Sequence, residues 1–180
     1  YEIEFSDWSS DVCSSDLLVK LIIHHGEKHI VVKDVEGNDI ELPIAQYIYL
    51  DMSGDEFRFH NELYNRILQE TLEHLEDENF VAETYFANHP DPEVSRIASL
   101  PTGEQEVSTA SLQLQLNAEK LRQFVFKDLL SFRTHYIAQR LIEVQQEFAR
   151  NPSNRELVEE FMKLKKMNSL LASQTNSVFN

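Results

Sequence analysis

The stretch AEKLRQFVFKDLLSFRTHYIAQRLIEVQQEFAR, residues 118–150, decides the fold predicted for this chain. It contains neither Gly nor Pro, the two residues that most often interrupt helices. Apolar residues recur along it at three- and four-residue intervals from Leu121 to Phe148. That spacing predicts one long amphipathic helix, which at 1.5 Å per residue would extend about 50 Å.

The residues that follow predict a second helix folded back on the first. The turn Asn151-Pro152-Ser153-Asn154 interrupts the first helix, and Ser153 or Asn154 can cap the next one. Apolar residues then recur on one face at positions Leu157, Phe161, Leu164, Met167 and Leu171. Two amphipathic helices joined by so short a turn predict an antiparallel helical hairpin.

Upstream, residues 17–100 predict a bundle of short helices with one small β-hairpin. A helix is expected from Leu17 to the stop at Gly26, and β-branched residues then flank Gly37-Asn38 in the pattern of a hairpin. Start signals for four further short helices are Pro43, Asn61, Asn79 and Asp91 with Pro92. The expected fold class is therefore mainly α: a helical bundle with a small β-hairpin, followed by a long helix and a C-terminal antiparallel helical hairpin.

Two segments are expected to lie outside these folded parts. Residues 1–16 contain most of a near-repeat that ends at Leu17: Trp8-Ser9-Ser10-Asp11-Val12 is followed by Cys13-Ser14-Ser15-Asp16-Leu17, without helical or strand periodicity. We interpret them as a non-native or disordered leader and expect residues 6–16 to be unpacked. Residues 101–111 are polar and predict a linker, which assigns residues 112–180 to the long helix and the hairpin.

Composition and charge exclude several classes of protein. The single Cys among 180 residues excludes a disulfide framework and a cysteine-based zinc site. No apolar run approaches the length of a membrane span, and no secretory signal is visible, so we expect a cytoplasmic protein and no membrane partner. Residues 1–111 contain 6 basic and 24 acidic residues, whereas residues 112–180 contain 10 and 7. The acidic part would repel nucleic acid, so direct binding to nucleic acid is not expected.

The sequence offers no pattern of catalytic, cofactor-binding or metal-ligating residues. His24, His25 and His29 lie close together, but Gly26 ends the helix that would place two of them on one face. There is neither a phosphate-binding glycine loop nor a nucleophile elbow. We therefore expect a non-enzymatic helical interaction module with no cofactor and no metal.

Three segments between Asp55 and Ser95 carry a resemblance to a known family. They read DEFRFHNELY, NFVAETYF and NHPDPEVS, and begin at Asp55, Asn79 and Asn88. This combination resembles the C-terminal, helicase-binding domain of bacterial DNA primase. The resemblance covers residues 18–99 closely, and residues 121–171 in their arrangement of helices.

The resemblance implies a partner and a role. The chain would correspond to the C-terminal part of a primase, without its catalytic domains. It would bind the N-terminal domains of the hexameric replicative helicase and recruit primase to the replication fork for RNA primer synthesis. Three alternatives stay open: a helicase-loader-like adaptor unrelated to primase, a general scaffolding domain, and a metal-dependent phosphohydrolase, which the missing His-Asp motif disfavours.

The candidate residues for contacting the helicase lie on the second helix of the hairpin. Val158, Met162 and Leu170 fall partly off the apolar face that would pack against the first helix. Apolar residues in such positions can anchor a helix in a partner's groove. They can also widen the stripe that packs within the hairpin, and the sequence favours neither arrangement.

Overall fold

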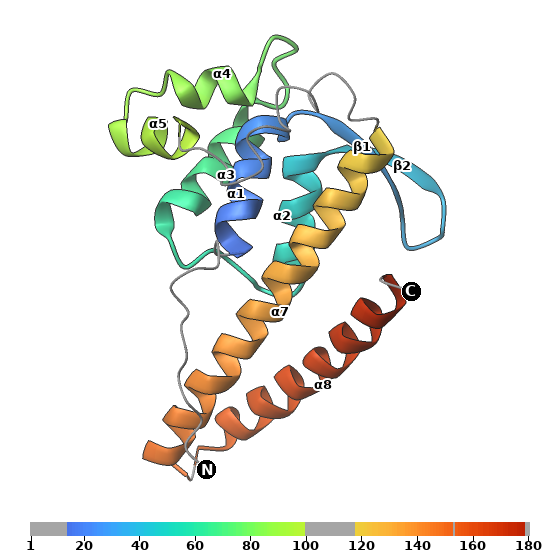
Figure 1. Cartoon of the computed structure of the whole chain (residues 1–180). Coiled ribbons are helices and arrows are strands. Elements are labelled where there is room, and N and C mark those ends of the chain that lie inside the picture. The colour runs from blue at the N-terminus through green and yellow to red at the C-terminus, as the bar shows by residue number, and fades with distance from the viewer. Residues whose placement is uncertain (1–13, 100–117, 153, 179–180) are drawn as a thin grey trace. The chain divides into compact units, whose positions relative to one another are not determined.

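The computed structural model of the chain describes residues 14–99, 118–152 and 154–178 (Figure 1). It forms two compact units, residues 1–125 and 126–180, and the helix α7 (Ala118–Arg150) runs from the first into the second. The predicted fold class is confirmed: the described residues are mainly helical, with one two-stranded hairpin and a long helix followed by a C-terminal helix. The predicted linker, residues 101–111, lies outside the described residues.

The first unit is a small helical bundle around α1. Its elements are α1 (Ser14–His25), β1 (His29–Lys33), β2 (Asp39–Pro43), α2 (Ile44–Gly54), α3 (Glu62–His74), α4 (Ala82–Ala87) and α5 (Pro92–Ser99). Helix α1 packs against α2, α3 and α4, and α5 packs against α4. Helix α1 is central because Leu18, Val19, Ile22 and Ile23 are all fully buried, which leaves it little polar face.

Gly26 lets the end of α1 approach α3 closely. A Cβ atom at this position would lie 2.4 Å from the carbonyl oxygen of Ile22 and 2.9 Å from Cγ2 of Thr71. The Gly26 carbonyl also accepts a hydrogen bond from the backbone N–H of Ala45. The residue predicted to end the helix therefore also sets how closely α1, α2 and α3 pack.

The hairpin pairs β1 and β2 in antiparallel register, with Ile30 opposite Leu42 and Val32 opposite Ile40. Ile30 and Val32 are buried, so one face of this small sheet belongs to the core of the first unit. Its turn is closed by the Asp34 side chain, which accepts hydrogen bonds from the backbone N–H groups at positions 36 and 38. Gly37 has a φ of 86°, a conformation that residues with side chains rarely adopt.

Three predicted helix caps are confirmed. The side chain of Asn61 accepts a hydrogen bond from the Leu63 N–H at the start of α3, and that of Asp91 accepts one from the Glu93 N–H at the start of α5. Asn154 does the same for the N–H of Glu156 in the C-terminal helix. Each cap pairs a backbone donor that has no partner within the helix.

Three other boundaries differ from the prediction. Asn79 does not cap a helix: its N–H donates to Asp77 in a turn, and α4 begins only after Val81. Pro43 is the last residue of β2 and the N-cap of α2, which begins at Ile44, one residue later than predicted. Helix α1 begins at Ser14, so residues 14–16 are packed, and Asp16 accepts a 2.6 Å hydrogen bond from the Tyr64 hydroxyl. The predicted boundary at residue 17 is therefore wrong, and the remaining leader residues, 1–13, lie outside the described part.

The second unit is the predicted helical hairpin. Figure 1 shows α8 (Arg155–Val178) returning alongside the C-terminal half of α7 in the antiparallel direction. Buried residues on both helices form its apolar seam: Ile137, Val144, Leu157, Leu164 and Leu171. One polar contact also joins the two helices, because Arg140 donates two hydrogen bonds to the Glu160 carboxylate, at 2.7 and 3.0 Å. Such a bidentate pair fixes the register between helices.

Candidate functional site

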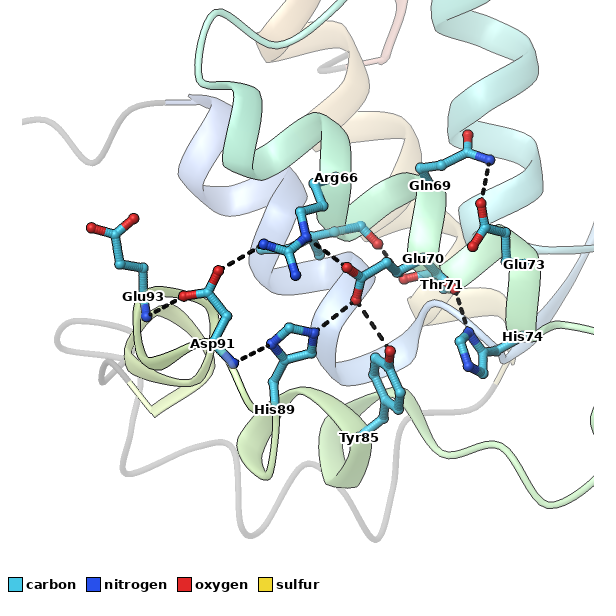
Figure 2. Close-up of polar contacts among 11 residues, drawn as sticks. Arg66, Gln69, Glu70, Thr71, Glu73, His74, Tyr85, His89, Asp91 and Glu93 are labelled. Atoms are coloured by element: carbon cyan, nitrogen blue, oxygen red, sulfur yellow. Dashed lines mark hydrogen bonds and ion pairs between the residues drawn. The ribbon is translucent and has the colours of Figure 1, made fainter.

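Several polar side chains in the described part of the first unit converge on Glu70. Figure 2 shows Arg66, Glu70, Tyr85, His89 and Asp91 meeting where α3, α4 and the start of α5 come together. We call these five residues the Glu70 cluster. One carboxylate oxygen of Glu70 accepts from Arg66 Nε at 2.7 Å, and the other accepts from the Tyr85 hydroxyl at 3.2 Å and from His89 Nε2 at 3.0 Å.

The tautomer of His89 follows from its two hydrogen bonds. Its Nδ1 lies 3.1 Å from the backbone N of Asp91, which has a hydrogen to donate, so Nδ1 acts as the acceptor. Its Nε2 must then carry the hydrogen that is donated to Glu70. The imidazole is 3% exposed and lies edge-on to the ring of Tyr85. Both ring nitrogens are therefore engaged within the fold.

Charge within the cluster is balanced through Arg66, which donates to both Glu70 and Asp91 at 2.7 Å. Burial raises the pKa of Glu70, but the hydrogen bond from Arg66 and the nearby His89 outweigh it, so this pKa lies below its usual range. The pKa of Asp91 is also lowered, first by the N–H of Glu93 and then by Arg66. Both groups stay ionised at neutral pH.

This arrangement contains the histidine and carboxylate of an acid–base dyad, but neither ring nitrogen of the histidine is free to exchange a proton with a substrate. A catalytic imidazole oriented by a carboxylate needs its second nitrogen free to exchange a proton with a substrate. Here that nitrogen, Nδ1 of His89, is occupied by the backbone N–H of Asp91, the residue directly before α5. The Glu70 cluster is therefore suited to holding three helices together.

The histidines considered for metal binding point to different partners. His24 Nδ1 lies 3.3 Å from Glu83, whereas Nδ1 of His25 lies 2.8 Å from the ammonium of Lys28. Burial, and then the charge of Lys28, lower the pKa of His25 to about 4. Within the described ranges, no group of three or more His, Cys, Asp or Glu residues is placed to hold a metal ion.

The second candidate site is an exposed apolar surface on α8. Val158 is 44% exposed, Met162 64% and Leu170 56%. Positions 158, 162, 166 and 170 repeat every four residues, so they follow one face of the helix. This face points away from the seam that contains Leu157, Leu164 and Leu171. Of the two arrangements that the sequence left open, the structure thus shows these three side chains outside the packing between the helices.

We call Val158, Met162 and Leu170, with the lysines Lys163 and Lys166 beside them, the outer face of α8. Large exposed apolar side chains on a helix are a feature of protein-binding surfaces. Sequence spacing alone identified the three apolar residues of this face. It did not identify the Glu70 cluster, because Glu70 and Arg66 stand among many exposed charges of α3 and nothing in their spacing marks them.

Comparison with known families assigns the chain to one of them. The model of a family described as a domain of unknown function, DUF8430, matches residues 16–178, which include nearly all described residues of both units. The chain belongs to the DUF8430 family. No curated protein and no solved structure matches the chain. The role of this DUF8430 member must therefore be inferred from its own residues, and the resemblance to the primase domain stays a prediction.

Across the described part of this DUF8430 chain, every helix is too short or too polar to cross a membrane.

Proposed function

We propose that this DUF8430 member is a non-catalytic, cytoplasmic interaction module that belongs to a bacterial DNA primase. Its C-terminal hairpin binds the N-terminal domains of the hexameric replicative helicase and so recruits primase to the fork for primer synthesis. The observation that carries the interaction role is the exposure of Val158, Met162 and Leu170 along one face of α8. The identity of the partner rests on the resemblance of residues 18–99 to the helicase-binding domain of primase.

The geometry of the hairpin supports a binding role. Its seam is completed by buried apolar residues and by the Arg140–Glu160 pair, so packing within the hairpin does not use the opposite face of α8. Burying side chains such as Met162 and Leu170 at the centre of an interface contributes about 1–2 kcal/mol each. Met also adapts its shape to a partner's surface more readily than branched residues do.

The Glu70 cluster supports the non-catalytic part of the proposal. It is the best-developed group of titratable side chains in the described part of the first unit, and the hydrogen bonds of its histidine are taken up by the fold. A helicase-binding module needs no chemistry of its own.

The proposal is tested by titrating the full chain into a purified hexameric replicative helicase from a bacterium that encodes a DUF8430 protein. Met162→Asp with Leu170→Asp should weaken binding at least about thirtyfold, because charges replace apolar anchors. The circular dichroism spectrum and the melting temperature should stay near those of the unchanged chain.

The matched control is Val35→Asp with Ile142→Asp, two exposed apolar positions that do not lie on α8. It should bind as tightly as the unchanged chain. Absence of binding by the unchanged chain would refute the helicase assignment. Equal affinity of the Met162 and Leu170 double variant would refute the placement of the contact on α8.

A further inference from the structure

The outer face of α8 combines apolar side chains with positive charge. Lys166 lies four residues after Met162 and four before Leu170, so its ammonium group stands one helical turn from each. Lys163 lies three residues before Lys166 and seven before Leu170, which places it along the same border. Both lysines are exposed. The exposed apolar surface is therefore bordered by two cations, and one exposed carboxylate, Glu159, lies on the same face three residues before Met162.

Neither cation is neutralised by the fold. Among the residues that the structure describes, no carboxylate lies within ion-pair distance of Lys163 or Lys166. This is unexpected in a chain with 31 acidic and 16 basic residues. On the same hairpin, Arg140 contacts Glu143, Glu147 and Glu160. Lys165, between the two free lysines, lies over the ring of Phe161 at 5.5 Å.

We infer that the outer face of α8 binds an amphipathic helix of a partner protein whose apolar stripe is bordered by Asp and Glu. A helix that packs against this face can cover Met162 and Leu170 with its apolar side chains while its carboxylates approach Lys163 and Lys166. The inference rests on the interaction role proposed above, and it adds the chemistry of the partner's surface.

Charge elsewhere in the chain favours a protein over a membrane or nucleic acid. Residues 126–180 contain 8 basic and 6 acidic residues, a net charge of only +2. Residues 1–125 contain 8 basic and 25 acidic residues, a net charge of −17. Anionic lipid surfaces and phosphate backbones would repel such a molecule. A local pair of lysines beside apolar anchors can still meet a local acidic border on a protein helix.

The first experiment measures how charge reversal affects binding to the helicase. Lys163→Glu with Lys166→Glu should weaken binding at least about tenfold at low salt, and the remaining affinity should depend less on salt. The control is Lys127→Glu with Arg150→Glu, an equal change of charge at exposed positions of α7. It should leave the affinity within about twofold. Helicase binding that is equally insensitive to both double variants would overturn the inference while leaving the proposed function intact.

The second experiment does not depend on the helicase. Two synthetic amphipathic helical peptides carry identical apolar residues, bordered by Glu in one and by Lys in the other. The full chain should bind the Glu peptide at least about tenfold more tightly, with NMR shift changes on the outer face of α8, and Met162→Asp should abolish this binding. Absence of binding to the Glu peptide, or equal binding of both peptides, would overturn the inference. So would tighter binding to vesicles of phosphatidylcholine and phosphatidylserine.

Discussion

The Glu70 cluster and the outer face of α8 differ in how far their side chains are paired within the fold. In the Glu70 cluster, a single carboxylate accepts from three donors, and Arg66 also reaches Asp91. On the outer face of α8, Met162 and Leu170 are more than half exposed, and Lys163 and Lys166 have no carboxylate partner among the described residues. The polar groups of the Glu70 cluster are paired with one another within the fold, whereas the apolar and charged side chains on the outer face of α8 remain available to a partner.

The difference shows why a cluster of titratable side chains is not by itself evidence of a functional site. A histidine that is hydrogen-bonded to a carboxylate resembles part of a catalytic site. Whether it can act as an acid or a base depends on whether its second ring nitrogen is free to exchange a proton. In this fold, exposed apolar side chains and charged side chains without an ion-pair partner are the better indicators of a functional site. The comparison predicts that substitutions in the Glu70 cluster reduce stability, and that substitutions on the outer face of α8 reduce binding.

The largest expected effect comes from Glu70→Ala. It would leave the buried N–H of His89 and the hydroxyl of Tyr85 without their acceptor, and we expect a loss of about 3 kcal/mol in the free energy of unfolding. Denaturant unfolding followed by circular dichroism measures this loss. Glu73→Ala is the control on the same helix, because the exposed Glu73 accepts only a hydrogen bond from Gln69. A cost as small as that of the control would show that the cluster does not hold the helices together.

A smaller effect is expected from pH, through His25. Burial, and then Lys28, lower its pKa to about 4, from 6.5 in the unfolded chain. Between these values the unfolded state binds the proton and the folded state does not, so the contribution of His25 to stability falls as the pH is lowered from 6.5 to 4 and rises in the reverse direction. After allowance for partial exposure, the loss should be about 2 kcal/mol.

Unfolding measurements across this pH range check the effect of His25. Asp128 acts in the opposite direction, because burial raises its pKa to about 6 and its protonation then stabilises the folded state as the pH is lowered. The effect of His25 is therefore the difference in pH dependence between the unchanged chain and His25→Gln, and this difference should be absent in His29→Gln, which replaces an exposed imidazole. Below this window, the lowered pKa values of Glu70 and Asp91 should add a further loss of stability as these carboxylates become protonated. An unchanged slope in His25→Gln would assign the pH dependence to other groups.

The smallest effect on stability is expected on α8. Met162→Ala with Lys166→Ala removes exposed side chains that make no contact within the seam, so the free energy of unfolding should change by less than about 0.5 kcal/mol. Thermal unfolding of the variant beside the unchanged chain is the measurement. A loss larger than about 1 kcal/mol would show that this face is used by the fold, and the contrast between the two regions would disappear.

The parts of the fold that follow from local sequence were predicted well. Helix α7 runs over the predicted residues, 118–150, because no Gly or Pro interrupts its periodic apolar pattern. Asn61, Asp91 and Asn154 cap helices because a side-chain oxygen next to an apolar pattern satisfies a nearby backbone donor, which is a local interaction. Helical spacing placed Met162 and Leu170 partly off the apolar face, but their exposure was decided only by the structure.

The features that the sequence did not reveal depend on distant partners. The start of α1 at Ser14 brings Asp16 to Tyr64, 48 residues away along the chain. Asn79 satisfied the local rule for a cap, but its N–H is taken by the turn at Asp77. The Glu70 cluster joins residues of α3 and α4 with two residues of the connection between α4 and α5. No periodicity within one helix can show that His89 and Asp91 will reach α3.

The shared acceptor in the Glu70 cluster also restricts the order in which substitutions can accumulate in this chain. Tyr85→Phe removes one 3.2 Å hydrogen bond and leaves Glu70 with two donors, so it can be accepted at any time. Replacing Glu70 while His89 is present leaves a buried N–H without an acceptor, which lowers the stability of the fold. The replacement becomes less costly once His89 has been replaced by an apolar residue. The same pair of substitutions is thus expected to pass through a strongly destabilised intermediate in one order and to avoid it in the other.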